Sequence, residues 1–206
     1  MSSLVQGLIK SLAMTVLSEV GDNTFFATAI LAMRHPRRPV LFGCLASLTV
    51  MTILSAFVGW AAPNLISRKW AHHITTLLFF GFGLWSLWDG INDEGDDDEF
   101  AEVEAKMDAE LKAETGTTKK NSKAFSVTFF GEWGDKSQLA TIGLAADENP
   151  FGVVFGGIIG QALCTVAAVL GGKSLASRIS EKIVALSGGV LFIAFGIQSF
   201  LSTVES

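Results

Sequence analysis

The segment Glu19-Val20-Gly21-Asp22-Asn23-Thr24 recurs 113 residues later as Glu132-Trp133-Gly134-Asp135-Lys136-Ser137. Each copy places two carboxylates three residues apart in a stretch that is otherwise apolar enough to cross a membrane. An acidic side chain at the centre of a spanning helix costs roughly 2.5 to 3.5 kcal/mol on insertion scales. Four such side chains, arranged as a duplicated pair, therefore predict an ion site rather than a packing feature.

The composition around these segments is that of a membrane protein. Of the 206 residues, 50% are hydrophobic and 17% are charged, and the mean hydropathy is +0.45, which is unusual for a soluble domain. Residues 91–120 hold eleven of the twenty acids and four lysines, a local charge of −7. The total charge of −5 then leaves +2 for the remainder, so the acidity belongs to one segment. We expect the lipid bilayer, and no nucleic acid, as a partner.

Six segments are long and apolar enough to span a bilayer, which takes about 20 residues. They lie near residues 5–32, 40–61, 71–90, 124–146, 151–172 and 183–202. The acidic motifs interrupt the first and the fourth segment. Short turns join most of the segments, which leaves little room for a soluble domain.

The chain matches itself at a shift of 113 without gaps. Over residues 15–86, 21 of 72 positions (29%) are identical, among them Glu19/Glu132, Gly21/Gly134, Asp22/Asp135 and Thr52/Thr165. A unit of three helices is odd in number, so a second unit enters the membrane from the opposite side if the linker does not cross. We predict an all-α membrane protein with six to seven transmembrane helices. They form two inverted three-helix repeats with broken or kinked motif helices, residues 1–90 and 124–206, joined by an acidic linker, 91–123.

The basic residues predict the orientation of these repeats. Eleven Lys and Arg residues fall on one side of the predicted membrane, and the other side has only Lys10, Arg68 and Lys69. By the positive-inside rule the linker is cytosolic and both termini lie outside or in a lumen. His72 and His73 follow Arg68 and Lys69 and are expected at the membrane edge. The two cysteines, Cys44 and Cys164, are expected to be small buried side chains.

The motif residues indicate the chemistry of the site. On a continuous helix Thr15, Glu19, Asp22 and Asn23 would share one face, as would Thr128, Glu132, Asp135 and Lys136. The glycine between the acids either admits a neighbouring helix or breaks the helix. If the two strips face each other, four carboxylates converge: Glu19, Asp22, Glu132 and Asp135. Such hard oxygen ligands suit Ca²⁺ and Mn²⁺ and could hold partly hydrated Mg²⁺, whereas Zn²⁺ and Cu²⁺ are poorly served.

Protons are the expected competitors for these ligands. Repulsion and desolvation favour protonated carboxyl groups when no cation is bound, so cation binding expels protons. The expected activity is exchange of a divalent cation for protons, with the metal as cargo and no cofactor. Lys136 adds a positive charge beside the site. Further polar residues could line a path, although Ser and Thr on spanning helices often bond their own backbone: Thr24, Thr28, Ser47, Ser137, Gln138, Thr141 and Gln161.

The doubled motif resembles the Gdt1 family, also called uncharacterised protein family 0016. Its hallmark is two copies of Glu-x-Gly-Asp-(Lys or Arg)-(Thr or Ser) around an acidic loop, and the resemblance covers essentially the whole chain. It implies Ca²⁺/Mn²⁺ transport in exchange for protons in Golgi, chloroplast or bacterial membranes, with the Golgi favoured here because no chloroplast transit peptide is evident. Matched positions are Glu19, Gly21, Asp22, Thr24, Glu132, Gly134, Asp135, Lys136 and Ser137. Asn23 departs from the expected Lys or Arg, which makes the site more acidic and less symmetric.

Two other functions fit parts of the pattern. An intramembrane aspartyl protease could use Asp22 and Asp135 as a catalytic pair. The partner glutamates, Lys136 and the internal symmetry argue against it, because proteolysis requires none of them. A passive cation channel would share the site without tight coupling to protons.

Overall fold

The computed structural model describes residues 3–20, 22–65, 68–92, 105, 125, 128–129, 134–176 and 181–201, and this part of the chain is helical without strands. The helices are α1 (Ser3–Glu19), α2 (Asn23–Arg34), α3 (Arg37–Leu65), α4 (Arg68–Asn92), α7 (Lys136–Asp147), α8 (Pro150–Ala176) and α9 (Glu181–Leu201). Most of the predicted linker, residues 91–123, lies outside the described residues. The all-helical prediction is confirmed for the part that is described.

Four of these helices are long and apolar enough to cross a membrane, over Arg37–Ala62, Lys69–Asn92, Pro150–Gly171 and Lys182–Leu201. The predicted span near 5–32 is broken at its motif, as the sequence predicts. The chain there forms α1 and α2, which are bent by 67° and together make a fifth candidate span. Most of the residues before Gly134 in the predicted span near 124–146 lie outside the described part of the chain. The helix that follows, α7, has only 12 residues. A broken motif helix, the alternative that glycine allows, is what the first motif adopts.

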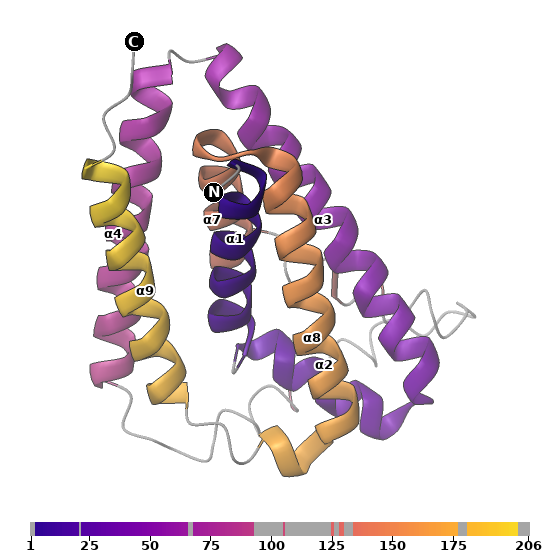
Figure 1. Ribbon diagram of the computed structural model, residues 1–206. Helices are drawn as coiled ribbons and strands as arrows, with labels where there is room; N and C mark the ends of the chain where they lie inside the picture. The colour runs from indigo at the N-terminus through magenta and orange to yellow at the C-terminus, as the bar shows by residue number, and fades with distance from the viewer. Residues whose placement is uncertain are drawn as a thin grey trace.

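The helices pack in pairs that join the two halves of the chain (Figure 1). α4 lies beside α9, α1 beside α8, α2 beside α8 and α3 beside α7. Figure 1 also shows that α3 and α8 run in opposite directions, as do α4 and α9. Each short helix that follows a motif therefore packs on the long helix of the other half.

The closest approach between α1 and α8 depends on glycine. Gly152, Gly156 and Gly160 lie four residues apart on α8, so they form one stripe on its surface. A Cβ atom at Gly152 or Gly156 would lie 2.3 Å from a backbone carbonyl oxygen of α1. Small residues at this spacing let two membrane helices touch backbone to backbone.

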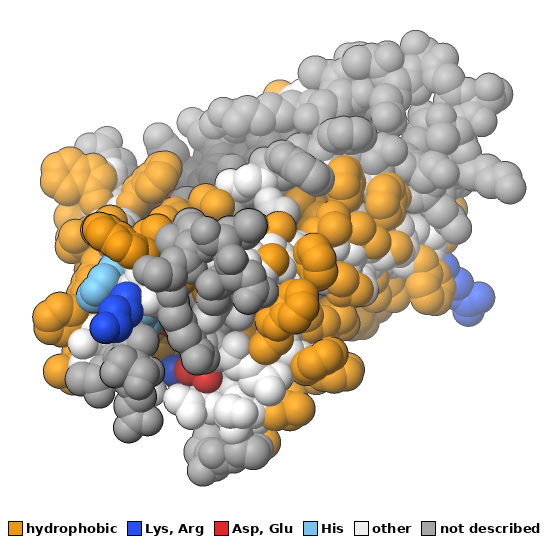
Figure 2. Space-filling model, turned by 90° about the horizontal axis from the view of Figure 1, so that it is seen from above, with side chains coloured by type: hydrophobic (Ala, Val, Ile, Leu, Met, Phe, Trp, Pro, Cys, Tyr) orange, Lys and Arg blue, Asp and Glu red, His pale blue; other side chains and the backbone are white. Residues whose placement is uncertain are grey.

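The outer surface is apolar and polar side chains are buried, as expected for helices that face lipid. Figure 2 shows hydrophobic side chains over much of the visible surface, with few charges between them. Exposed examples on α3, α4 and α8 are Phe57, Leu77, Trp88, Phe151 and Leu170. On the inner face of α1, by contrast, Ser11, Thr15 and Glu19 are buried. Polar side chains buried inside an apolar bundle indicate where its functional site lies.

Candidate cation site

The second motif begins helix α7. Gly134 has a φ of +90°, a left-handed conformation that side chains disfavour, and its N–H donates to Gln138 Oε1 at 2.7 Å. Asp135 then caps the helix, because its side chain accepts from the N–H of Ser137. The turn therefore places the Asp135 carboxylate at the positive end of α7. Asp22 is the equivalent residue before α2, also in an extended conformation, without a side-chain cap bond.

Replacing Gly134 with Ala is expected to strain this turn. A Cβ atom would meet nothing within 4 Å, so the cost comes from the backbone alone, about 1 to 2 kcal/mol. We expect a lower thermal midpoint of the purified protein in detergent. Gly143→Ala on α7 is the control, because there a Cβ atom would contact Thr75 at 3.2 Å with no left-handed backbone. An unchanged midpoint for Gly134→Ala would contradict the requirement for a positive φ.

Ser137 connects the two motifs. Its Oγ lies 2.8 Å from Glu19 Oε1 and 2.7 Å from Asp135 Oδ2. A hydroxyl has one proton, so it donates to one carboxylate at a time. Glu19, at the end of α1, is only 5% exposed, and both Asp135 and Asp22 repel its negative charge. Carboxylates that are 116 residues apart in the sequence thus meet in the interior.

Two small cavities flank this bridge, each of about 10 Å³, which is room for about one water molecule. The first cavity is lined by Asp135 and Ser137 together with Leu48, Met51, Thr52, Ser55, Gln138, Thr141 and Gln161. The second is lined by Glu19, Thr24, Phe25, Thr28, Leu48, Thr128, Cys164, Thr165 and Ala168. Each cavity has one of the bridged carboxylates in its wall.

The linings of the two cavities correspond at the shift of 113. The pairs are Thr24/Ser137, Phe25/Gln138, Thr28/Thr141, Leu48/Gln161, Met51/Cys164, Thr52/Thr165 and Ser55/Ala168. In three of these pairs, Phe25/Gln138, Leu48/Gln161 and Ser55/Ala168, a polar side chain corresponds to an apolar one, and the first cavity holds the amides of Gln138 and Gln161. The second cavity has Phe25 and Leu48 at those places. The two cavities are therefore equivalent in position and different in polarity.

The remaining predicted residues divide into three groups. Thr24 and Thr28 reach the second cavity, and the Thr24 hydroxyl is buried without a hydrogen-bond partner. Thr141 donates to the carbonyl of Ser137 on its own helix, the common behaviour of a helical threonine. The side chains of Asn23 and Lys136, and all of Glu132, lie outside the described residues.

The bend divides the predicted polar strip of the first motif between two elements. Thr15 and Glu19 belong to α1, whereas Asp22 precedes α2 after the bend. Within the described ranges, no three His, Cys, Asp or Glu side chains lie close enough together to hold a metal ion. The convergence of all four carboxylates, including Glu132, therefore stays a prediction.

Some site residues were missed from the sequence. Thr52 donates to Gln161 Oε1 at 2.8 Å, and Ser55 is buried in the same wall without a hydrogen-bond partner. The identity of Thr52 and Thr165 in the self-comparison was the available signal, because a repeated polar residue within a span is rarely accidental. Cys44 is buried as predicted, and the Thr28 and Thr128 hydroxyls donate to its Sγ.

Known proteins are similar in sequence to this chain over its whole length. The family model described as "Divalent cation/proton antiporter GDT1" matches residues 7–94 and 121–206. The chain is 67% identical to GDT1-like protein 5 and 66% identical to GDT1-like protein 4 of Arabidopsis thaliana, with 100% of both chains covered in each comparison. It is 63% identical to GDT1-like protein 5 of Oryza sativa subsp. japonica, over 98% of this chain and 97% of the relative. No solved structure matches.

A match of this extent assigns the chain to a class. Antiporters move ions and convert no substrate, so the protein is a transporter and not an enzyme, and the aspartyl protease alternative is wrong. Its apolar helices fit a multi-pass protein of the membrane. The chain belongs to the GDT1 family of divalent cation/proton antiporters.

Proposed function

We propose that the protein exchanges Mn²⁺ or Ca²⁺ for protons at a site formed by Glu19, Asp22, Glu132 and Asp135. The observation that carries this proposal is the Ser137 hydroxyl between Glu19 and Asp135. The buried Glu19 carboxylate and the half-buried Asp135 carboxylate share one hydroxyl donor, so together they carry excess negative charge, which a divalent cation or protons can neutralise. Hard oxygen donors select Ca²⁺ or Mn²⁺ over softer metals.

The site is proposed to be the point where two half-pathways meet. The two cavities have one carboxylate each and are related by the shift of 113. Alternating access requires that the site open to each side of the membrane in turn, and the two cavities are proposed to mark the two routes. Ser137 is proposed to donate to Glu19 or to Asp135, according to which carboxylate is free of cargo.

The proposed architecture is a pair of inverted three-helix repeats. It is supported by helix starts that differ by 113: Asn23 and Lys136, Arg37 and Pro150, Arg68 and Glu181. The opposite directions of α3 and α8 (Figure 1) agree with inversion. So does the exchanged packing, because α2 on α8 and α7 on α3 are the same contact with the halves interchanged.

The proposed location is the Golgi membrane, with the acidic linker in the cytosol and both termini in the lumen. The orientation rests on the eleven basic residues that fall on the linker side and the three on the other. The choice of the Golgi rests on the family resemblance. In this orientation Lys10 and Lys69 lie on the lumenal side.

Transport by the purified chain in lipid vesicles tests the function. When Mn²⁺ or Ca²⁺ is added outside vesicles that have an acidic interior, we expect the vesicles to take up the cation and to lose protons from the interior. Dissipating the pH gradient with a proton carrier is expected to remove the excess uptake. A passive channel would let the cation in at the same rate with or without the gradient. That outcome would contradict proton exchange.

A further inference from the structure

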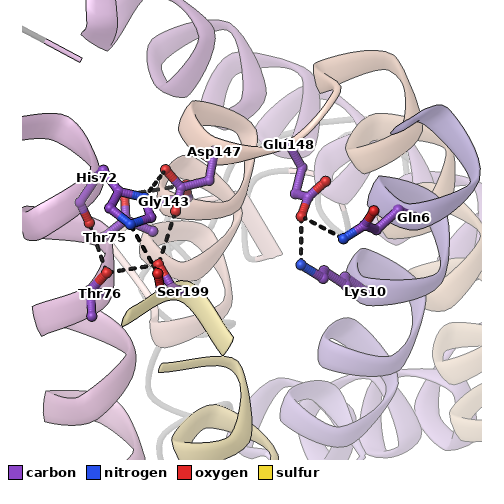
Figure 3. Close-up of polar contacts among 9 residues, drawn as sticks. All are labelled: Gln6, Lys10, His72, Thr75, Thr76, Gly143, Asp147, Glu148 and Ser199. Carbon is purple, nitrogen blue, oxygen red and sulfur yellow. Dashed lines mark hydrogen bonds and ion pairs between the residues drawn. The ribbon is translucent and has the colours of Figure 1, made fainter. Parts of the chain in front are cut away.

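A second polar cluster lies at the end of α7 opposite to the motif residues. Figure 3 shows His72 of α4 between Asp147, at the end of α7, and Ser199 of α9. His72 Nδ1 is 3.1 Å from Asp147 Oδ1, and Nε2 is 2.9 Å from the backbone carbonyl oxygen of Ser199. Ser199 Oγ also donates to Asp147 Oδ2 at 3.2 Å. One imidazole thus joins three helices.

The partners of the ring fix the number of protons in the cluster. A backbone carbonyl only accepts, so Nε2 must carry a hydrogen. A neutral imidazole then has no hydrogen on Nδ1, and the ring nitrogen would face an ionised Asp147 carboxylate as a second acceptor. The contact at 3.1 Å needs one further proton, either on Nδ1 or on the carboxyl group. Without that proton two acceptors face each other and the contact is lost.

The surroundings favour the bound proton. The side chains of His72 and Asp147 are 13% and 18% exposed, so water reaches them only in part. Asp147 is the last residue of α7 and lies outside the candidate membrane spans. Burial raises the pKa of its carboxyl group, while the hydrogen bond and charge of His72 lower it. Because the pKa is raised, this group favours the docked arrangement at low pH, and the contribution is lost as the pH rises through the raised value. The negative C-terminal end of the α7 dipole also favours the bound proton.

Few other charges face the pair. Glu148, next to Asp147, repels it and is itself paired with Lys10 of α1. His73 has its ring centre 6.2 Å from that of His72, and the exposed Lys69 lies one turn before it on α4. α9 has no charged residue after Lys182, and α3 has none after Arg38. The proton between His72 and Asp147 is therefore the main variable charge at this junction.

We propose that His72 and Asp147 form a proton-binding site, separate from the motif carboxylates, that fastens the end of α7 to α4 and α9. α7 begins at the Asp135 and Ser137 bridge and ends at this site. Twelve residues of helix thus connect the proposed cargo site with a proton-controlled contact. The regulatory part of the inference, that proton release frees α7 to move, rests on the proposed function.

The site is present at one end of the α4 and α9 pair only. At the shift of 113, His72, Asp147 and Ser199 correspond to Ala185, Arg34 and Ser86. There Ser86 Oγ donates to the carbonyl of Ala185 at 2.8 Å, which joins the helices without a titratable pair. In the proposed orientation the proton site faces the lumen, so it senses the pH of one compartment.

Hydrogen exchange of the full-length protein in lipid nanodiscs tests the proton site without transport. After correction for the intrinsic pH dependence of exchange, opening of the last turn of α7 is expected to rise roughly tenfold between about pH 5.5 and 8, the loss of one charge-assisted hydrogen bond. The Asp147→Asn amide donates to a neutral ring, so this variant is expected to keep the low-pH protection throughout. His72→Gln is expected to remove the pH dependence as well. Ser86→Ala is the matched control and is expected to retain the wild-type slope.

Three outcomes would overturn the proposal. The first is that opening of the last turn of α7 does not change with pH in the wild type. The second is that Asp147→Asn and His72→Gln both keep the wild-type pH dependence, and the third is that Ser86→Ala loses it. The thermal midpoint of each variant, measured at pH 5.5, shows whether it is folded, and two different variants guard against failure of one. A wild type that shows the slope but no vesicle transport would refute the proposed function and leave the proton site standing.

Discussion

Replacing Glu19 with Gln is expected to abolish proton-driven uptake of Mn²⁺ and Ca²⁺ while leaving the protein folded. The amide keeps an oxygen that can accept from Ser137 Oγ, now 2.8 Å from Glu19 Oε1, but it cannot release a proton and holds no charge for the cation. Loss of a group that only supports a metal ligand costs roughly 10- to 100-fold in affinity or activity. Loss of the carboxylate itself is therefore expected to lower the initial uptake rate by at least about 100-fold.

Glu148→Gln provides the same chemical change outside the site. Glu148 pairs with Lys10 at the turn between α7 and α8, where the two side chains are 13% and 17% exposed. The amide keeps an oxygen that accepts from Lys10 and leaves the motif carboxylates unchanged, so this variant is expected to retain uptake within about threefold, a change of under about 1 kcal/mol. Ser137→Ala keeps both carboxylates and removes the donor between them, and should fall between the two. If wild-type uptake depends on the pH gradient and Glu19→Gln retains full uptake, Glu19 has no role in the mechanism.

Replacing Gly156 with Ala is expected to have the largest effect on stability. The new Cβ atom would lie 2.3 Å from the carbonyl oxygen of Leu8 and 3.0 Å from the N–H nitrogen of Leu12, and neither backbone atom can rotate away. α1 and α8 must then separate, an overpacking cost of about 1 to 3 kcal/mol or more. We expect a lower thermal midpoint and a smaller monodisperse fraction in size-exclusion chromatography in detergent.

Gly81→Ala separates this effect from the general consequence of adding a methyl group to a helix. At Gly81, on α4, a Cβ atom would meet nothing within 4 Å. Ala is favoured over Gly in a helix interior by roughly 0.5 to 1 kcal/mol, so the midpoint should stay or rise. Equal midpoints for Gly156→Ala and Gly81→Ala would show that α1 and α8 do not approach as closely as the structure places them.

The sequence was sufficient for the features that depend on composition and repetition. Apolar length identified the helices, and the doubled motif identified Glu19 and Asp135 as residues that belong together. The choice between a continuous and a broken motif helix was open, because a glycine permits both. After the bend before Asn23, α2 packs on α8, a tertiary contact that no local pattern encodes.

The clusters built from distant single residues were beyond the sequence. His72 and Asp147 are 75 residues apart and correspond to Ala185 and Arg34 in the other half, so the self-comparison gave no signal for them. His72 was expected at the membrane edge, but not as a partner of α7. Ser55 became a site residue only through the packing of α3, α7 and α8 around one cavity.

The exchanged packing of the two halves also bears on how the protein is made. The ribosome releases α1 and α2 long before α7 and α8, so Ser11, Thr15 and Glu19 enter the bilayer before the helices that cover them exist. Ser11 Oγ donates to the carbonyl of Val153, and Glu19 accepts from Ser137. Until those partners are synthesised, the first half has polar groups that lipid cannot satisfy. The early helices therefore reach their final packing only after the C-terminal half has been inserted. Until then we expect the translocation machinery to shelter their polar groups.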